Sequence, residues 1–186
     1  MNIVLASASP RREELMKKTG LAFIIDPADI DERAVEEKSA KKLAVKLAIK
    51  KAEAVASRHP NSIIIGSDLV VAYKDRQFGK PENTQDAKDM LLLLRGKTHQ
   101  MFTAVAVINT KNAKIATAVE EASITMRNYS DQEIDEYIAT GEPVDKAAAY
   151  AVQGIGRKLI ERFTGNMEAI IGLPTKNVLR LISEVK

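Results

Sequence analysis

The chain begins with MNIVLASASPRREEL, residues 1–15, and this stretch predicts a strand, a turn and a helix in direct succession. The apolar run 3–5 is typical of a short buried strand. Ser9 favours the N-cap of a helix, and Pro10 suits the first helical position, where the N–H that proline lacks is not needed. The stretch therefore introduces an alternation of strand and helix that the remaining sequence continues.

The turn between this strand and helix also indicates an anion site. Arg11 and Arg12 fall in the first helical turn, at the positive end of the helix dipole, where each cation is disfavoured by ~0.3–1 kcal/mol. A bound anion reverses that sign, because backbone N–H groups, the hydroxyls of Ser7 and Ser9 and both guanidinium groups then converge on it. The alternative is a solvated basic turn whose arginines pair with the glutamates that follow them. The sequence lacks the Gly-x-x-x-x-Gly-Lys pattern of a P-loop.

Length and composition narrow the functional class. A chain of 186 residues with 45% hydrophobic and 28% charged residues suits one large domain or two small ones with a sizeable core. Aromatic residues make up 4%, without Trp, which argues against a stacking surface for single-stranded nucleic acid. Cysteine is absent and the histidines are His59 and His99, so thiolate or histidine metal sites are not expected. The net charge of +3 suits small anionic substrates. Without a membrane-length apolar run or a signal-peptide pattern, we expect no membrane partner and a cytoplasmic location.

A long helical pattern, predicted over 39–58, carries one lysine on its apolar face. The apolar stripe at i, i+4 spacing consists of Leu43, Leu47, Lys51 and Val55. A separate, solvated stripe consists of Lys42, Lys46 and Lys50. Lys51 therefore either extends along its own stem to the surface or holds its ammonium group at the rim of a pocket. The other anion-binding features favour the pocket.

The strongest strand pattern, predicted over 62–72, contains a carboxylate among apolar residues. A buried Asp68 is costly unless it is paired, hydrogen-bonded or bound to a metal. Gly66 leaves room nearby for the close approach of a ligand or of another backbone. A structural Asp that accepts backbone N–H groups at a bulge is the alternative, but we favour a catalytic or metal-binding role for Asp68.

The rest of the chain continues the alternation, so the expected class is α/β. Further strands are predicted over 21–25, 101–109, 114–126 and around Leu159, Ile160 and Phe163; further helices are predicted over 84–94, between Ser130 and Gly141, and over 175–185. An acidic, irregular stretch that includes Glu32 lies between the predicted strand 21–25 and the helix 39–58.

The unusual polar residues together match the needs of phosphoryl-ester hydrolysis. That chemistry requires cations on several phosphate oxygens, a metal ion, and a carboxylate that takes a proton from water. The carboxylates able to hold a hard cation such as Mg²⁺ are Glu32 and Asp68. The amide of Gln153, which precedes the two glycines of 154–156, can both donate to and accept from a polar ring edge. The candidate anion-binding residues are Ser7, Ser9, Arg11, Arg12, Lys51 and Lys80.

Seven motifs in order make the chain closely resemble the Maf family, the septum-formation-inhibitor-like nucleoside triphosphate pyrophosphatases. One such motif is weak, but the ordered set is specific and spans nearly the whole chain. The matching segments are 5–12 (LASASPRR), 47–56 (LAIKKAEAVA, like LAxxKAxAVA), 65–71 (IGSDLVV, like GADTVV), 79–81 (GKP), 142–147 (EPVDKA), 153–156 (QGIG) and 172–174 (GLP).

The resemblance implies a single domain over 1–186, built as an elongated, twisted mixed sheet flanked by helices, with two lobes that share the sheet and a central cleft, similar to inosine-triphosphate pyrophosphatases. It implies cleavage of nucleoside triphosphates between the α- and β-phosphates to a monophosphate and pyrophosphate. It further implies a divalent cation, Mg²⁺ or alternatively Mn²⁺, an association with cell-division arrest, and allows a homodimer.

The resemblance also implies roles for individual residues. Asp68 matches the family's proton acceptor, and Glu32 with Asp68 matches its metal region. The phosphate-binding positions correspond to Ser7, Arg11, Arg12, Lys51 and Lys80, and the positions associated with base choice correspond to Arg11, Leu69 and Gln153.

Two positions depart from the family pattern. The branch that hydrolyses dTTP and UTP usually has Thr after the Asp, and the branch that acts on 7-methyl-GTP usually has Gln, whereas this chain has Leu69. The residues 10–12 and Gln153 favour the pyrimidine branch, while Leu69 lacks the hydroxyl that could hydrogen-bond and favours a broader or modified substrate range. Ala148 stands where the family often has Gly, and we expect a mild effect.

Other functional classes remain as alternatives. The main one is a nucleotide-binding regulator of septum formation that does not hydrolyse its ligand, and its signature would be tight binding without product. Nucleic-acid binding agrees with a pI near 9.0 but not with the scarcity of aromatic residues, and we expect none.

Overall fold

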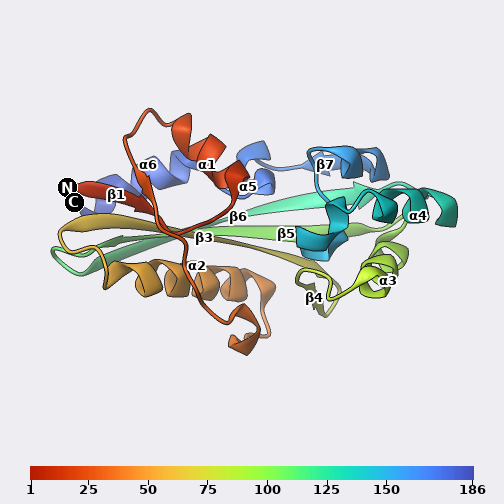
Figure 1. Ribbon diagram of the computed structural model, residues 1–186, viewed down its shortest axis with the longest axis horizontal. Coiled ribbons are helices and arrows are strands. Elements are labelled where there is room, and N and C mark those ends of the chain that lie inside the picture. Colours follow the sequence, from red (N-terminus) through yellow and green to blue (C-terminus); the bar gives the residue numbers. More distant parts are fainter. The chain divides into compact units, whose positions relative to one another are not determined.

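The predicted alternation of strands and helices is present in the computed structural model, which describes residues 1–186 (Figure 1). Six strands form one sheet in the order β2-β1-β3-β5-β6-β7, and β4 pairs with β3 beside this path. The strands are β1 (Asn2–Leu5), β2 (Ile24–Ile25), β3 (Ser62–Tyr73), β4 (Arg76–Phe78), β5 (Thr98–Asn109), β6 (Lys114–Met126) and β7 (Ile160–Thr164). The helices are α1 (Pro10–Lys17), α2 (Ala40–Ala56), α3 (Thr84–Leu94), α4 (Asp131–Ala139), α5 (Met167–Ile171) and α6 (Thr175–Val185), and the 3₁₀ turns are η1 (Glu32–Ala34), η2 (Glu142–Asp145), η3 (Ala147–Ala149) and η4 (Ile155–Leu159).

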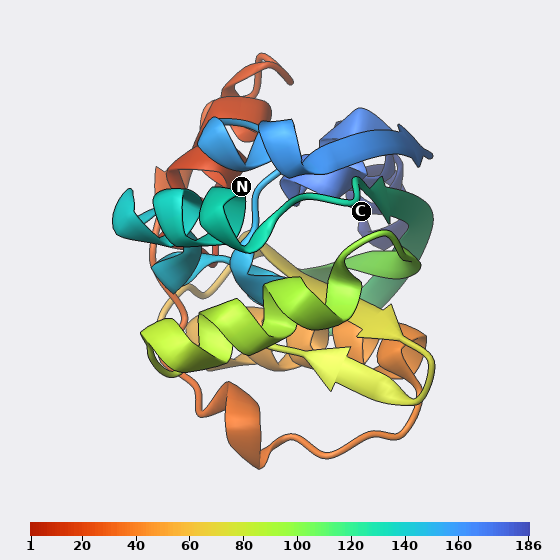
Figure 2. The ribbon, with the colours of Figure 1, turned by 90° about the vertical axis from the view of Figure 1, so that its right-hand side faces the viewer.

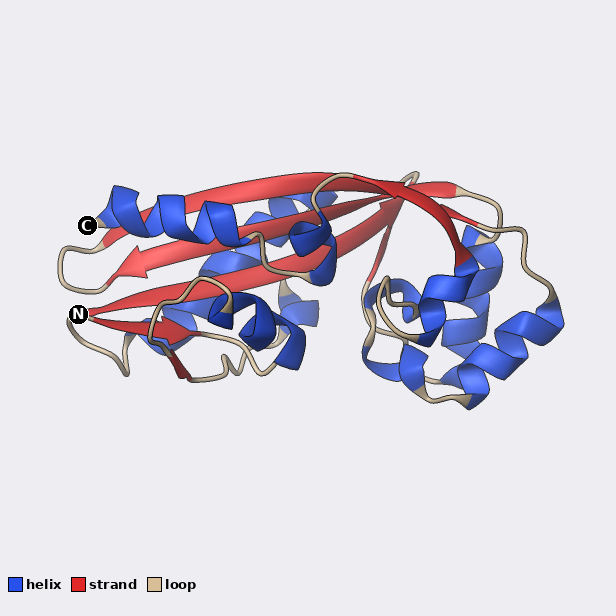
Figure 3. Cartoon of the chain, turned by 90° about the horizontal axis from the view of Figure 1, so that it is seen from above, coloured by secondary structure: helices blue, strands red, loops and turns tan.

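The sheet is mixed, which confirms the predicted fold class. Strand β1 runs parallel to both β2 and β3, with Leu5 opposite Ile25 and Ile65. The pairs β3–β4 and β6–β7 are antiparallel, with Val71 opposite Phe78 and Ile124 opposite Phe163. Figure 3 shows the long strands with helices against them. The parallel pairing of β1 and β3 places the two predicted site segments, 5–12 and 65–71, beside each other in space.

The chain forms two compact units. Unit 1 comprises 1–69, 102–120 and 166–186, and unit 2 comprises 70–101 and 121–165. The boundaries fall inside β3, near the start of β5, inside β6, and between β7 and α5. Both chain termini belong to unit 1 and lie at the same end of it (Figures 1 and 3).

Unit 1 has helices on both faces of its strands. Helix α2 covers one face, and α1 and α6 cover the other (Figure 1). On the α1 and α6 side, alternate residues of the strands meet the apolar faces of the helices and form a continuous core. This core contains Leu5, Leu15, Met16, Ile63, Ile65, Val105, Val107, Leu173, Val178, Leu181, Ile182 and Val185. Because strand side chains alternate between faces, the residues at even positions of β3 point toward α2.

Unit 2 is held together by contacts between α3, α4 and the 3₁₀ turns. Helices α3 and α4 are linked by the ion pair of Lys88 with Asp135 at 2.5 Å, and the Tyr129 hydroxyl donates to the Leu91 carbonyl at 2.6 Å. The Ala148 N–H donates to the Gly79 carbonyl at 3.0 Å, which ties η3 to the segment after β4. Figure 2 views this group of helices face on.

Some predicted elements differ in length from those of the structure, and some elements of the structure were not predicted. The strand predicted over 21–25 pairs only over Ile24–Ile25, and Leu21 and Phe23 before it pack against the core of unit 1. Strand β4 and helix α5 were not predicted, since neither is long enough to show a clear periodicity. Ser9 occupies the predicted N-cap position, but its side chain makes no capping hydrogen bond. None of the helices combines the length and apolar character needed to cross a membrane.

Candidate active site

Helix α1 presents Arg12 to a small polar cluster. The Arg12 Nε donates to the carbonyl oxygen of Gly172 at 3.0 Å, and a terminal guanidinium nitrogen donates to Ser7 Oγ at 3.4 Å. Ser7 is buried, and its Oγ also accepts the backbone N–H of Ser9 at 3.2 Å. The predicted grouping of Ser7 with Arg12 is therefore present, and the guanidinium is held by partners that leave some of its donors for a ligand.

Ser67 connects the same cluster to β3, and sequence reasoning missed it. Its hydroxyl lies 2.9 Å from the Gly172 carbonyl and 2.8 Å from the Ala104 carbonyl, and the side chain is fully buried. The Gly172 carbonyl thus accepts from Ser67 and Arg12 together. Gly172 has φ +126°, a conformation that other residues rarely adopt. A serine within the apolar run of β3, directly before Asp68, was the available signal.

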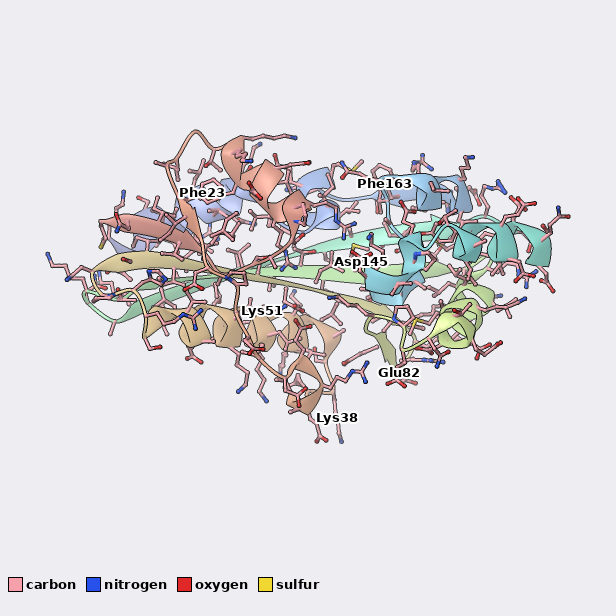
Figure 4. All side chains as sticks on the ribbon, viewed as in Figure 1. Phe23, Lys38, Lys51, Glu82, Asp145 and Phe163 are labelled. Atoms are coloured by element: carbon pink, nitrogen blue, oxygen red, sulfur yellow. The ribbon has the colours of Figure 1, made fainter.

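On the opposite face of β3, Lys51 bridges two carboxylates. The Lys51 Nζ lies 2.5 Å from Asp68 Oδ1 and 2.7 Å from Glu32 Oε1. Lys51 and Asp68 are 8% and 5% exposed, so Lys51 does not extend to the surface, and its predicted place at the rim of a pocket stays a prediction. Figure 4 shows Lys51 between α2 and the sheet. A buried ammonium between two carboxylates satisfies the rule that buried charges are paired.

Gly66 explains how α2 comes close enough to place Lys51. A Cβ atom at position 66 would lie 2.8 Å from the Ala52 backbone nitrogen and closer still to the Ala48 carbonyl oxygen. Only glycine admits the helix backbone at this distance. The room that Gly66 was predicted to provide is therefore taken by the α2 backbone, and the same approach brings Lys51 to Asp68.

The electrostatics of the cluster suit a proton acceptor. Burial raises the pKa of the Asp68 carboxyl, while the charges of Lys51 and Arg12 act in the opposite direction. Burial likewise lowers the pKa of the Arg12 guanidinium, and the charges of Asp68 and Glu32 oppose that change. Arg12, Asp68 and Glu32 therefore act on one another electrostatically, and a carboxylate whose pKa lies above its usual value is a better base.

The two carboxylates have the chemistry expected for Mg²⁺. Glu32 and Asp68 contact one ammonium nitrogen, so they are close enough to share one cation. Mg²⁺ is commonly held by one or two carboxylates together with phosphate oxygens of a substrate. These carboxylates are of the ligand type that Mg²⁺ uses, but they hold the Lys51 ammonium in this structure, so a Mg²⁺ site here stays a prediction.

The remaining predicted site residues are divided between the two units. Arg11 is half-buried beside Arg12, and its charge acts on the pKa of the Arg12 guanidinium. Leu69 is half-buried at the end of unit 1, directly after Asp68. Lys80 and Gln153 are exposed residues of unit 2, after β4 and before η4, and their predicted roles stay predictions.

Comparison with known proteins agrees with the motifs. A family model described as "Maf-like protein" matches residues 2–185. The chain belongs to the Maf family. A relative from Dictyoglomus thermophilum (strain ATCC 35947 / DSM 3960 / H-6-12), named dTTP/UTP pyrophosphatase, is 42% identical over 98% of this chain and 95% of its own length. A relative of the same name from Bacillus mycoides (strain KBAB4) is 39% identical over 99% of this chain and 94% of its own length.

The structure gives a physical reason for the glycine positions in several Maf motifs. The glycine of the 65–71 motif admits α2, and the glycine of the 172–174 motif turns its carbonyl toward Arg12 and Ser67. Ala148, where the Maf pattern often has Gly, has φ +57°, which explains the preference for glycine. Ala148 is also fully buried, so the packing of its methyl group offsets part of the backbone cost.

Proposed function

We propose that this chain hydrolyses nucleoside triphosphates at the bond between the α- and β-phosphates, releasing a nucleoside monophosphate and pyrophosphate, with dTTP and UTP as the preferred substrates. The pairing of the buried Lys51 with Asp68 and with the more exposed Glu32, whose charges act on Arg12, is the observation that carries the proposal. The names of the Maf relatives support the choice of substrate.

Asp68 is the proposed proton acceptor. In this scheme Asp68 takes a proton from water as the water oxygen attacks the α-phosphorus, and the bond to the bridging oxygen of pyrophosphate breaks. The pKa of the carboxyl, raised by burial, matches this task. Arg12 and Lys51 would neutralise the charge that grows on the phosphate oxygens, and Ser7 would hold Arg12 in place.

Mg²⁺ is the proposed cofactor, with Glu32 and Asp68 as its protein ligands. When bound, such an ion polarises phosphate oxygens and stabilises the negative charge of the transition state. Mn²⁺ accepts the same oxygen ligands and is the alternative.

Base choice would rest on Arg11, Leu69 and Gln153. Leu69 is half-buried and offers no hydrogen bond to a base, so we expect discrimination between bases to depend chiefly on Arg11 and Gln153. Lys80 is the proposed further contact to the phosphates. A homodimer, a cytoplasmic location and a part in cell-division arrest stay predictions.

The test is a pyrophosphate-release screen with Mg²⁺ over common and modified nucleoside triphosphates, with Asp68→Asn as the variant. Because Asp68→Asn removes the proposed general base, we expect this variant to lower turnover by ~10²–10⁴-fold. Because Asn has nearly the same shape and Lys51 keeps Glu32 as a partner, the variant should stay folded, which circular dichroism and thermal unfolding would confirm. Wild-type turnover in this variant would refute the role of Asp68. Nucleotide binding with no product from any substrate would instead support the regulator.

A further inference from the structure

A carboxylate in unit 2 holds the glycine-rich turn that follows Gln153. The Glu142 Oε1 accepts the Ile155 N–H at 3.1 Å, and Oε2 accepts the Gly156 N–H at 2.7 Å. The two oxygens of one side chain thus fix two successive backbone amides. Hydrogen bonds to an ionised carboxylate are shorter and stronger than those between neutral groups.

Both glycines of this turn lie where a Cβ atom would overlap a neighbouring group. Gly154 has φ +94°, and a Cβ atom there would collide with the Glu142 carboxylate. At Gly156 a Cβ atom would lie 2.5 Å from the Tyr137 hydroxyl and 2.9 Å from the Ala151 carbonyl oxygen. In the QGIG motif, Gly154 therefore packs against the Glu142 carboxylate, and Gly156 packs against Tyr137 and Ala151.

Glu142 is itself well positioned by the end of α4. Gly141 has φ +76° and ends the helix, and the Glu142 N–H donates to Thr140 Oγ1 at 3.2 Å. The Tyr137 side chain of the same helix is buried, and its hydroxyl lies beside Glu142 without a hydrogen bond of ordinary geometry. The carboxylate therefore belongs to a fixed element and restrains the first residues of η4.

Gln153 stands directly before the clamped turn and is exposed, so its amide is free to meet a ligand, while the backbone N–H groups of Ile155 and Gly156 shortly after it are held. We propose that Glu142 is a positioning residue for base selection: its carboxylate fixes residues 154–156 and thereby the direction of the Gln153 amide. This inference rests on the proposed function, because Gln153 is the residue assigned there to reading the base. Preorganised donors and acceptors discriminate better than mobile ones, since less ordering is needed on binding.

The kinetic experiment compares Glu142→Ala and Glu142→Gln with the wild type on dTTP, UTP, dCTP and dATP. Glu142→Ala removes both acceptor oxygens, and Glu142→Gln keeps one. We expect discrimination between the best and worst base to fall roughly tenfold in Glu142→Ala, mainly through KM, and by less in Glu142→Gln. The matched control is Glu161→Gln on β7, an exposed glutamate of the same unit, which should leave KM and kcat unchanged.

A double-mutant cycle separates positioning from general stability. If Glu142 acts through Gln153, then Glu142→Ala should change discrimination very little once Gln153→Ala is present. A purely structural Glu142 would lower the melting temperature while leaving the ratio of KM values intact, or would add its effect to that of Gln153→Ala. Either result would overturn the inference.

Two further measurements do not require turnover. Amide hydrogen exchange in the ligand-free protein should show faster exchange at Ile155 and Gly156 in Glu142→Ala, and unchanged exchange there would refute the clamp. Calorimetric nucleotide binding to Asp68→Asn, with and without Glu142→Ala, should show the same loss of base discrimination. If the wild type cleaves no nucleotide, the proposed hydrolysis fails, but the binding experiment still tests the role of Glu142. Equal ratios of nucleotide affinities with and without Glu142→Ala would overturn that role.

Discussion

The charge of Asp68 is tolerated in a buried strand because two cations act on it. Lys51 contacts it directly, and Arg12 acts on it from the other cluster. Removal from water opposes ionisation, and paired charges favour it. Burial likewise controls the ionisation of His99, outside this site.

His99 should make the stability of the protein depend on pH. The ring is 1% exposed, with Nε2 at 2.6 Å from the Tyr150 hydroxyl, and burial lowers the pKa of His99 to about 4. In the unfolded chain the pKa of histidine is about 6.5, so below this pH the unfolded chain binds a proton that the folded chain does not bind. The free energy of unfolding therefore falls by up to ~1.4 kcal/mol per pH unit as the pH drops toward 4. Urea unfolding of wild type and His99→Gln between pH 4 and 7 checks this. Parallel stability curves for the two proteins would contradict it.

Ala113 carries backbone strain in the turn between β5 and β6. It is exposed and has φ +59°, which costs a non-glycine residue ~1–2 kcal/mol. Ala113→Gly should therefore stabilise the protein by about 1 kcal/mol in chemical denaturation. The matched control is Ala54→Gly within α2, which should destabilise by a similar amount because its backbone is helical. Destabilisation by both substitutions would rule out strain at Ala113.

At the scale of elements, the contact between α2 and β3 decides the site. The helix pattern places Lys51 on the buried stripe, and the strand pattern places Asp68 on the same side as Gly66. The two side chains meet only because small residues, Ala48 and Ala52, pack onto a glycine. The site is thus a product of close packing between backbones.

Gly66→Ala should disturb both stability and activity. The added methyl group would overlap the Ala48 carbonyl and the Ala52 nitrogen, so α2 must move away, and overpacking of this kind costs ~1–3 kcal/mol. Lys51 would then be displaced from Asp68, and pyrophosphate release should fall along with the melting temperature. Gly79→Ala is the control, because a Cβ atom there meets nothing within 4 Å. Equal effects of the two substitutions would contradict the account.

At the scale of the whole molecule, unit 1 is assembled from chain segments far apart in sequence. Residues 166–186 supply α6, whose Leu181 and Ile182 complete the core. The Val185 carbonyl accepts the side-chain amides of Asn109 at 2.9 Å and Asn112 at 3.0 Å, which ties the end of α6 to the turn between β5 and β6. Unit 1 therefore cannot complete its core before the end of the chain is present.

A fragment that ends at residue 165 tests this dependence. We expect it to lack cooperative thermal unfolding of unit 1, because the strands would expose the core face that α6 covers. Circular dichroism and hydrogen exchange of β1 and β3 are the measurements. Addition of a 166–186 peptide should restore protection. A fragment with wild-type cooperativity would show that α6 is dispensable for the core.

The sequence by itself determined the class, the family and most elements. The helices over 84–94 and 175–185 and the strand over 114–126 were predicted with the bounds that the structure has, and the two helices have a sustained apolar periodicity. Lys51 and Asp68 stood out because each is a charge within an apolar pattern. Short elements such as β4 and α5 have too few residues for a period to emerge.

Only the tertiary structure decided which residues meet. The bridge of Lys51 between Glu32 and Asp68, and the Gly172 carbonyl shared by Arg12 and Ser67, join segments up to 160 residues apart. The clamp of Glu142 on the turn after Gln153 depends on a helix end and a glycine conformation together. Periodicity reports which face of an element a side chain occupies, but not which other element covers that face. That choice follows from close packing of the complete chain.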